Sequence, residues 1–183
     1  MNSFYTLEEL RNIGFCSIGR SVFISKKASF YSVENIIIGS DVRIDDFCIL
    51  SGTIRIGSHV HISAYCGLYG ANGIELEDYT GLSPRCTVFS ATDDFSGNFL
   101  IGPMVNENFT NVTGGKVILH KYSQVGASSI IMPGAILNEG VAVGAMSLVK
   151  GSLNEWSIYA GVPAKKINDR SRNLMNFINA GLL

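Results

Sequence analysis

The sequence predicts an all-β fold, a parallel β-helix of hexapeptide repeats, and two observations support this prediction. The first is a period of six: aliphatic residues recur at this spacing from 38 to 68 and again from 119 to 149. This period fits neither an α-helix, which repeats every ~3.6 residues, nor one long strand, which repeats every ~2. It fits a short strand followed by a turn, so that three hexads make one triangular coil. Because one coil cannot bury its own core, successive coils must stack as a solenoid.

The second observation is a column of small residues. When the coils are stacked in register, the fifth positions of the second hexads are Ala28, Cys48, Cys66, Cys86, Ser129 and Ser147. A small side chain there lets the chain turn a corner of the triangle. We therefore interpret these three cysteines as small buried residues, and not as disulfide partners, metal ligands or nucleophiles. Six coils at a strand spacing of about 4.8 Å predict a prism roughly 30 Å tall.

Irregular segments flank and interrupt the predicted prism within a single domain. Residues 1–14 are expected to hold a short helix, because Thr6 and Glu9 have the spacing of a capping box. The coils are expected over 15–93 and 116–153, separated by a loop at 94–115 that is rich in Asn, Gly and Phe. Loops of this length are usually functional or disordered. Residues 154–183 are expected to form a C-terminal segment and a short helix, with Asp169 as its N-cap.

Charge and hydropathy argue against several classes of protein. The formal net charge is −1, which provides no basic surface for a nucleic acid or an anionic membrane. No apolar run approaches the ~20 residues that span a bilayer. Residues 1–6 have neither the basic nor the apolar region of a signal peptide. We therefore expect a cytoplasmic protein without membrane insertion or a nucleic-acid partner.

The repeats, the long loop and the C-terminal motifs resemble the hexapeptide-repeat acyltransferase superfamily over residues 15–170. The motifs read Ala145-Met146-Ser147-Leu148-Val149-Lys150 and Tyr159-Ala160-Gly161-Val162-Pro163-Ala164-Lys165. The resemblance is closest to galactoside, maltose and bacterial polysaccharide O-acetyltransferases. It implies a left-handed coil, although parallel crossovers are otherwise almost always right-handed. It also implies a homotrimeric enzyme that binds acetyl-CoA between neighbouring prisms and requires no metal.

The resemblance further implies where acetyl-CoA binds. Ala127 and Ala145 match positions whose backbone holds the pantetheine arm, because small side chains allow close approach. An ammonium group suits a contact to the CoA phosphates. The positions that match such contacts are those of Lys150, Lys165 and Lys166. Trp156 and Tyr159 either cover the adenine end or fill the groove, and the sequence leaves both alternatives open.

Transfer to a hydroxyl needs a group that accepts its proton, and histidine is the usual residue. His59 and His61 lie at outward-facing turn positions of a well-formed hexad, whereas His120 directly follows the long loop. In galactoside and maltose acetyltransferases the catalytic histidine lies within the loop, but this loop has none. The residues Asp93-Asp94-Phe95-Ser96-Gly97, followed later by a histidine, resemble a subgroup of capsule and O-antigen acyltransferases instead. We therefore expect His120 to be the catalytic base.

Three carboxylates are candidates for substrate binding or for orienting the imidazole. They are Asp93, Asp94 and Glu77, and the register stacks Glu77 beneath His120. The expected function is direct acetyl transfer from acetyl-CoA to a sugar or polysaccharide hydroxyl. One alternative is an N-acetyltransferase of a nucleotide-linked amino sugar. More remote alternatives are a non-catalytic scaffold and a zinc-dependent, carbonic anhydrase-like hydratase, for which the three histidines share no register.

Overall fold

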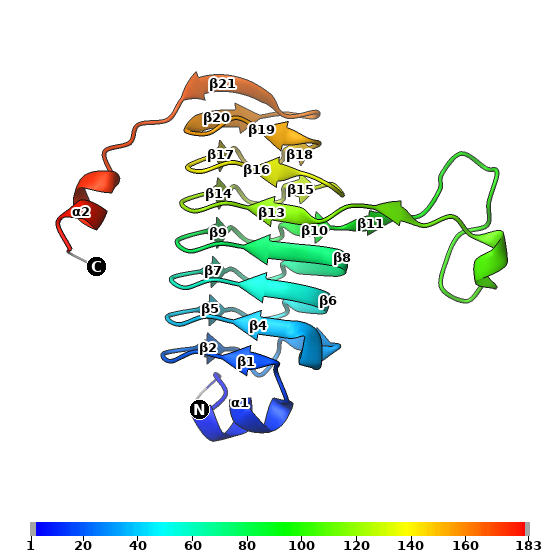
Figure 1. Cartoon of the computed structure of the whole chain (residues 1–183), viewed down its shortest axis with the longest axis horizontal. Coiled ribbons are helices and arrows are strands. Elements are labelled where there is room, and N and C mark those ends of the chain that lie inside the picture. The colour runs from blue at the N-terminus through cyan, green and yellow to red at the C-terminus, as the bar shows by residue number, and fades with distance from the viewer. Residues whose placement is uncertain (1–2, 182–183) are drawn as a thin grey trace.

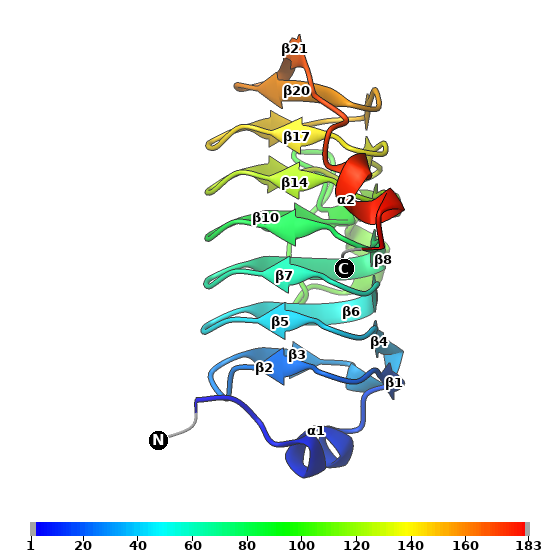
Figure 2. The same cartoon turned by 90° about the vertical axis from the view of Figure 1, so that its left-hand side faces the viewer.

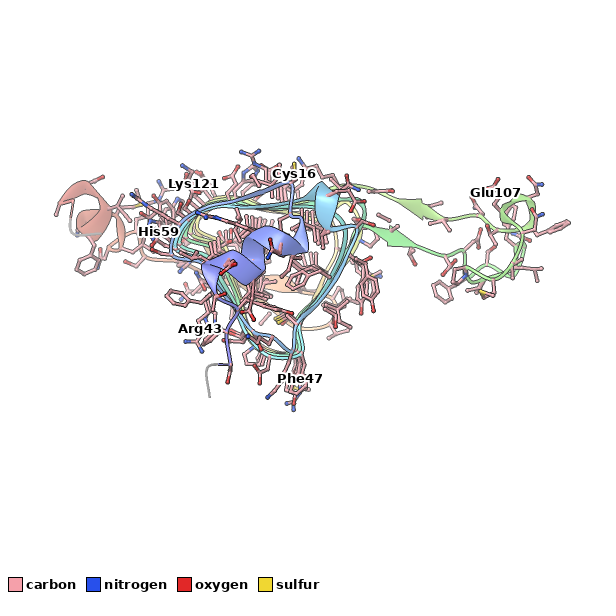
Figure 3. The ribbon with its side chains drawn as sticks, turned by 90° about the horizontal axis from the view of Figure 1, so that it is seen from below. Cys16, Arg43, Phe47, His59, Glu107 and Lys121 are labelled. Carbon is pink, nitrogen blue, oxygen red and sulfur yellow. The ribbon has the colours of Figure 1, made fainter. Side chains whose placement is uncertain are left out.

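The computed structural model describes residues 3–181 and shows a left-handed parallel β-helix of about seven turns, one more than the six expected (Figure 1). The coils form a prism that is triangular when seen along its axis (Figure 3). The first face contains β1 (Ser17–Ile18), β4 (Ile36–Ile38), β13 (Val117–Leu119), β16 (Ile136–Leu137) and β19 (Ser152–Leu153). The second contains β2 (Phe23–Ile24), β5 (Arg43–Ile44), β7 (His61–Ile62), β9 (Gly81–Leu82), β14 (Gln124–Val125), β17 (Ala142–Val143) and β20 (Ser157–Ala160). The third contains β3 (Ser29–Tyr31), β10 (Thr87–Phe89), β15 (Ile130–Ile131) and β18 (Leu148–Val149).

Two long strands pass from the third face to the first. They are β6 (Ile49–Ile56) and β8 (Gly67–Leu76), which pair with each other along both faces. The pairings between coils are parallel, and apart from a register shift between Gly52 and Ile54 of β6 they keep equivalent residues of successive turns above one another. At the top, β21 (Lys165–Asp169) pairs antiparallel with β20 and closes the second face (Figure 2).

The core consists of columns of inward-pointing residues. On the second face, for example, Ile44, Ile62, Leu82 and Val125 stack in consecutive turns and are each at most 2% exposed. The expected column of small residues is confirmed: its members are all buried, with exposures between 0 and 8%. Its thiols and hydroxyls donate hydrogen bonds to backbone oxygens, as Cys86 Sγ does to Gly126 O at 3.2 Å. The cysteines therefore serve as small core residues.

The corners of the prism require left-handed backbone. At the edge between the first and second faces, which we call the His59 edge, His59, Tyr79, Tyr122 and Trp156 have φ angles between 47 and 64°. At the edge between the second and third faces, the Phe47 edge, the equivalent residues are Phe47, Tyr65, Arg85, Ser128 and Met146. None of these side chains is β-branched, as this backbone region demands. The two edges thus carry ladders of outward-pointing side chains.

The third corner, which we call the arm edge, carries the long excursion. Strands β11 (Ala91–Thr92) and β12 (Thr113–Gly114) pair antiparallel as its stem, and η2 (Glu107–Phe109) lies near its tip (Figure 1). The excursion projects away from the prism as an arm with exposed apolar side chains. They are Phe95, Phe99, Leu100, Ile101, Met104, Phe109 and Val112, with exposures from 42 to 96%. Apolar surface of this extent is typical of a contact site.

Short helices lie at the two ends of the described chain. The predicted capping box is confirmed in α1 (Leu7–Ile13): Glu9 N donates to Thr6 Oγ1 and Thr6 N donates to Glu9 Oε2. The C-terminal helix α2 (Met175–Asn179) begins later than expected, because Asp169 ends β21 and binds Lys166 at 2.6 Å instead of capping a helix. A 3-10 helix, η1 (Val33–Asn35), fills a widened corner. Among the described residues, no helix is long and apolar enough to cross a membrane.

We predict that one of the four cysteines reacts with a thiol reagent in the native protein. Cys16 is exposed, whereas Cys48, Cys66 and Cys86 are buried. Hydrogen bonding with Cys48 and Cys86, together with burial, raises the pKa of Cys66, and the thiolate is the reactive form. Titration with DTNB should give one fast thiol per chain in buffer and four after denaturation. Fast reaction of two or more thiols in the native state would contradict the packing described above.

Candidate functional site

The upper half of the Phe47 edge carries a path of small residues. Strands β9, β14, β17 and β20 pair in register, so residues at one position of successive turns form a column. Its members are Ser83, Gly126, Gly144 and Ala160, in order from the middle of the prism to its top. The predicted cofactor residues Ala127 and Ala145 lie beside this column, in the next position of the same turns, where Met146 N donates to Ala127 O at 2.8 Å.

Backbone lies close to the surface along this path. A Cβ atom on Gly126 would lie 2.5 Å from Ala145 N, so only glycine fits there. A Cβ on Gly144 would come within 3.0 Å of Ala160 Cβ. The path ends above at β21, where Lys165 pairs with Ala160. A thin chain with amide groups could therefore lie along the path with an ammonium group at its upper end.

Ser83 marks the lower end of the path. Its amide donates to Val125 O at 2.9 Å, which holds it in the turn below Gly126. Its side chain is partly exposed, and its hydroxyl makes no hydrogen bond to any described residue. Above Ser83 the column has no polar side chain until Lys165. Ser83 was not among the predicted site residues, although the predicted register already places it directly below Gly126.

A cavity of about 840 Å³ lies at the arm edge, between the third face and the base of the arm. Its lining is mostly apolar and includes Tyr69 and Phe89, whose rings stack at 5.2 Å. Asp93 also lines this cavity and is partly exposed. Among the described residues, its carboxylate has no hydrogen-bond or ion-pair partner. The carboxylate is therefore free to bind a ligand.

Asp94, the next residue, has a structural role in the arm. Its carboxylate accepts hydrogen bonds from Ser96 N at 2.6 Å and from Asn111 Nδ2 at 3.0 Å. These bonds, that to Ser96 foremost, hold the pKa of Asp94 below its usual value. Asp94 thus fixes the start of the arm, whereas its neighbour Asp93 is available.

His120 lies at the end of β13, near the His59 edge. Its Nδ1 is 3.0 Å from Glu77 Oε1, and the other oxygen of Glu77 accepts a hydrogen bond from Lys121 N at 3.0 Å. The sequence placed Glu77 beneath His120, and the pairing of Leu76 with Leu119 puts it there. The two side chains line a pocket of about 520 Å³ together with Asn138, Glu139, Asn154 and Glu155.

The structure does not bring the predicted aspartates to His120 within one chain. Strand β13 runs from the arm edge to the His59 edge, so that His120 and the arm lie at opposite sides of the first face (Figure 1). Neither Asp93 nor Asp94 lines the pocket of His120. The role of His120 as a base remains a prediction, without either of the two predicted aspartates in its pocket.

The other histidines have separate partners. The ring of His59 stacks on Tyr79 at 4.6 Å, and His61 Nε2 lies 2.8 Å from Asp45 Oδ2. Within residues 3–181 no group of three His, Cys, Asp or Glu side chains is arranged to hold a metal ion. Each imidazole therefore takes part in a different local interaction.

The remaining predicted residues fall into two groups. Lys166 binds Asp169 at 2.6 Å on the same strand as Lys165, whereas Lys150 is exposed at the arm edge, across the third face from Ala145. Trp156 and Tyr159 are 5 and 8% exposed. Trp156 Nε1 donates to Glu139 Oε1 at 3.2 Å, and Tyr159 Oη accepts a hydrogen bond from Asn154 N at 3.0 Å. The ring of Tyr159 belongs to the core at the top of the prism, whereas the ring of Trp156 lies at the His59 edge, 6.2 Å from the ring of Tyr122.

Comparison with known proteins finds similar chains of nearly the same length. The chain is 41% identical over 170 residues to dTDP-4-amino-4,6-dideoxy-D-glucose acyltransferase from Escherichia coli, covering 91% of this chain and 88% of that protein. AntD, an N-acyltransferase from Bacillus cereus, is 55% identical with a TM-score of 0.97, covering 100% of this chain and 98% of AntD. A maltose O-acetyltransferase from Clostridium difficile 630 shares the fold at 20% identity and a TM-score of 0.59, with coverages of 90 and 75%. No family profile matches the chain.

The AntD structures bear on the candidate residues. They contain CoA with dTDP or with dTDP-4-amino-4,6-dideoxyglucose, or dTDP with 3-hydroxybutyryl-CoA. Several carry a replacement of one serine or of one aspartate ten positions further along the chain. Ser83 and Asp93 are the only serine and aspartate with this spacing here. The free hydroxyl and the free carboxylate thus match the spacing of the residues that were varied in AntD.

These similarities correct the functional expectation. Transfer to a sugar or polysaccharide hydroxyl was the main prediction, and it is wrong, because the relatives with 41 and 55% identity are an amino-sugar acyltransferase and an N-acyltransferase. The alternative, acylation of a nucleotide-linked amino sugar, is the one that they favour. The O-acetyltransferase at 20% identity supports the fold alone.

Proposed function

Because this chain belongs to the hexapeptide-repeat acyltransferase superfamily, we propose that it transfers an acyl group from acyl-CoA to the amino group of a nucleotide-linked amino sugar. The sugar is of the type dTDP-4-amino-4,6-dideoxyglucose, and the reaction takes place in the cytoplasm. The observation that carries the proposal is the full-length similarity to AntD at 55% identity. The presence of Ser83 and Asp93, whose side chains have no hydrogen-bond or ion-pair partner among the described residues, supports it.

In the proposed reaction the sugar amine attacks the thioester carbonyl. A C–N bond forms, the C–S bond breaks, and the amine loses one proton as CoA leaves as a thiol. Asp93 accepts a hydrogen bond from the amine and orients its lone pair toward the carbonyl carbon. Ser83, at the lower end of the path of small residues, binds near the thioester and donates to the oxygen that becomes negative.

The path of small residues holds the pantetheine arm in this proposal. From Ser83 to Ala160 it crosses three turn spacings, or about 14 Å at 4.8 Å per turn. Ala127 and Ala145 line it, as the resemblance implied. Lys165 contacts the CoA phosphates at its upper end, and Lys166 lies next to it on β21. Lys150, at the arm edge, reaches the same groove only from a neighbouring chain.

The site needs two chains. Ser83 and Asp93 lie at opposite sides of the third face, since β10 crosses this face between them. A ring of three chains in which the arm edge of one meets the Phe47 edge of the next brings both residues into one groove and turns the third faces toward the axis. That face exposes Tyr31, Tyr69 and Ile130, at 59, 37 and 39%, which suits a buried interface. The proposed assembly is therefore a homotrimer.

We predict that the purified protein acylates dTDP-4-amino-4,6-dideoxyglucose, with thiol release as the readout. The matched sugar nucleotide with a 4-hydroxyl group should give no product, because an alcohol is a poorer nucleophile than a neutral amine. Asp93→Asn should lower kcat/KM by about 10²-fold or more, since a neutral amide is a weaker hydrogen-bond acceptor than a carboxylate and orients the amine less well. Product from the 4-hydroxy sugar alone would contradict the proposed acceptor.

The same assay tests His120. His120→Asn removes the imidazole but keeps a polar side chain beside Glu77. If this variant retains its turnover and Asp93→Asn loses it, the residue that binds the amine is Asp93 and not His120. The opposite result would support the prediction that His120 is the base.

We also predict that Lys165→Glu weakens CoA binding, because it places a carboxylate near the phosphates. The loss should be at least about tenfold in low salt and should diminish as salt screens the repulsion. Lys121→Glu, at the His59 edge, is the matched control and should bind CoA like the native protein. Calorimetric titration that gives equal affinity for both variants would remove Lys165 from the site.

Mixed trimers test whether one site draws on two chains. Ser83→Trp, which blocks the end of the path, and Asp93→Asn should each be nearly inactive as pure trimers. Random mixing in equal amounts should restore about a quarter of the native activity, because that share of grooves combines an intact Ser83 with an intact Asp93. No recovery in mixtures whose exchange is verified by mass would place both residues in the site of a single chain.

A further inference from the structure

A stack of charged and aromatic side chains runs down the lower half of the Phe47 edge. The guanidinium of Arg85 lies 5.6 Å above the ring of Tyr65, and this ring stacks on Phe47 at 5.0 Å. Below them, Lys27 Nζ lies 5.2 Å from the Phe47 ring. The two rings are 53 and 46% exposed, and Phe47 projects from the corner of the prism (Figure 3). The stack begins two residues after Ser83.

The two cations of the stack differ in their partners. Lys27 Nζ is 2.8 Å from Asp46 Oδ2, and this bond raises the pKa of Lys27. Arg85 is exposed, and among the described residues it has no carboxylate partner. Its backbone is fixed by a hydrogen bond from Arg85 N to Ala64 O at 3.0 Å. Arg85 thus presents a charged, planar group of five N–H donors on an aromatic support.

Another arginine over an aromatic ring shows what is unusual about Arg85. At the His59 edge, Arg172 lies 5.1 Å over the ring of Trp156, but its Nη2 also lies 3.4 Å from Glu155 Oε1. The charge of Arg172 is therefore balanced within the protein. The charge of Arg85, in contrast, is balanced by no carboxylate among the described residues, although the chain as a whole has a net charge of −1.

We propose that Arg85 binds the diphosphate of the nucleotide-linked acceptor, with Tyr65 positioning its guanidinium. This inference rests on the proposed function. If CoA takes the path above Ser83, the acceptor has to approach the thioester from the other side, and Arg85 is the first cation there. In a 4-amino sugar nucleotide the sugar ring alone separates the diphosphate from the amine. The planar fork of arginine suits two phosphate oxygens, which a lysine cannot match in geometry.

The first test is calorimetric titration of the full-length protein with dTDP, which carries the diphosphate without the sugar. Arg85→Ala should weaken dTDP binding at least about tenfold, as expected when a charged hydrogen-bonding partner of a phosphate is lost. The dTDP affinity of Arg85→Lys should lie between those of the native protein and Arg85→Ala, because lysine keeps the positive charge and loses the planar guanidinium. Arg172→Ala is the matched control and should bind dTDP like the native protein. CoA affinity should be unchanged in all three variants.

The second test addresses Tyr65 as a positioning residue. Tyr65→Leu should raise the dTDP dissociation constant, whereas Tyr65→Phe should have a dissociation constant close to that of the native protein. The reason is that the aromatic ring supports the guanidinium and the hydroxyl does not. In steady-state assays Arg85→Ala should raise the acceptor KM and leave kcat nearly unchanged, which is the signature of lost uniform binding. A fall in kcat at unchanged KM would contradict a diphosphate contact.

The outcomes separate this inference from the proposed function. Native-like dTDP binding by folded, CoA-binding Arg85→Ala overturns the assignment of Arg85 and leaves the acylation proposal intact. If the native protein binds dTDP through Arg85 but does not acylate the amino sugar, the diphosphate site stands and the proposed reaction fails. If the native protein neither binds dTDP nor acylates the amino sugar, both are overturned.

Discussion

The constraint on which the rest of this structure depends is the register between successive coils. Each backbone amide of a strand bonds to the turn above or below it, so a residue at one hexad position lies over its equivalent, about 4.8 Å away. Every column must then consist of side chains that tolerate such stacking. Inward columns are aliphatic or small, and corner columns accept left-handed backbone. The proposed binding surfaces consist of the same kind of column. The path from Ser83 to Ala160 and the stack from Arg85 to Lys27 lie on one edge. They differ only in the size and charge of the side chain that each turn places there.

Register also explains which features could be predicted from the sequence. A period of six and a column of small residues suffice for the fold, for the buried cysteines and for the position of Glu77 beneath His120, because these depend on counting along regular coils. The regular repeat, and with it any prediction from counting positions, stops at the arm. Whether Asp93 or Asp94 faces the cavity depends on the Asp94 bonds to Ser96 and Asn111, which no repeat dictates. For the same reason the sequence placed His120 beside the loop, whereas β13 carries it across the first face. The last turn was missed in the count of coils, because after β19 and β20 the chain reverses into the antiparallel strand β21 instead of adding a strand to the third face.

An amine and a hydroxyl make different demands on a site, and this difference explains why the acceptor expected from the sequence was wrong. A hydroxyl must lose its proton as it attacks, so a histidine was the expected base. A neutral sugar amine is nucleophilic enough to attack before it loses a proton, so a carboxylate that orients it is sufficient. Asp93, unpaired beside an apolar cavity, meets that lesser demand. The repeats themselves carry no information on this point, since the O-acetyltransferase from Clostridium difficile has the same fold.

The separation of Ser83 from Asp93 within one chain suggests a role for the arm in the proposed assembly. A triangular prism has flat faces and corners that point outward. In the proposed trimer, a groove that excludes water from the thioester forms between prisms, and the exposed apolar residues of the arm provide the contact surface. In such an assembly the chain that positions CoA along the Phe47 edge differs from the chain that positions the amine. The reacting groups then meet only in the assembled protein, so that an isolated chain contains the parts of the site without the site itself.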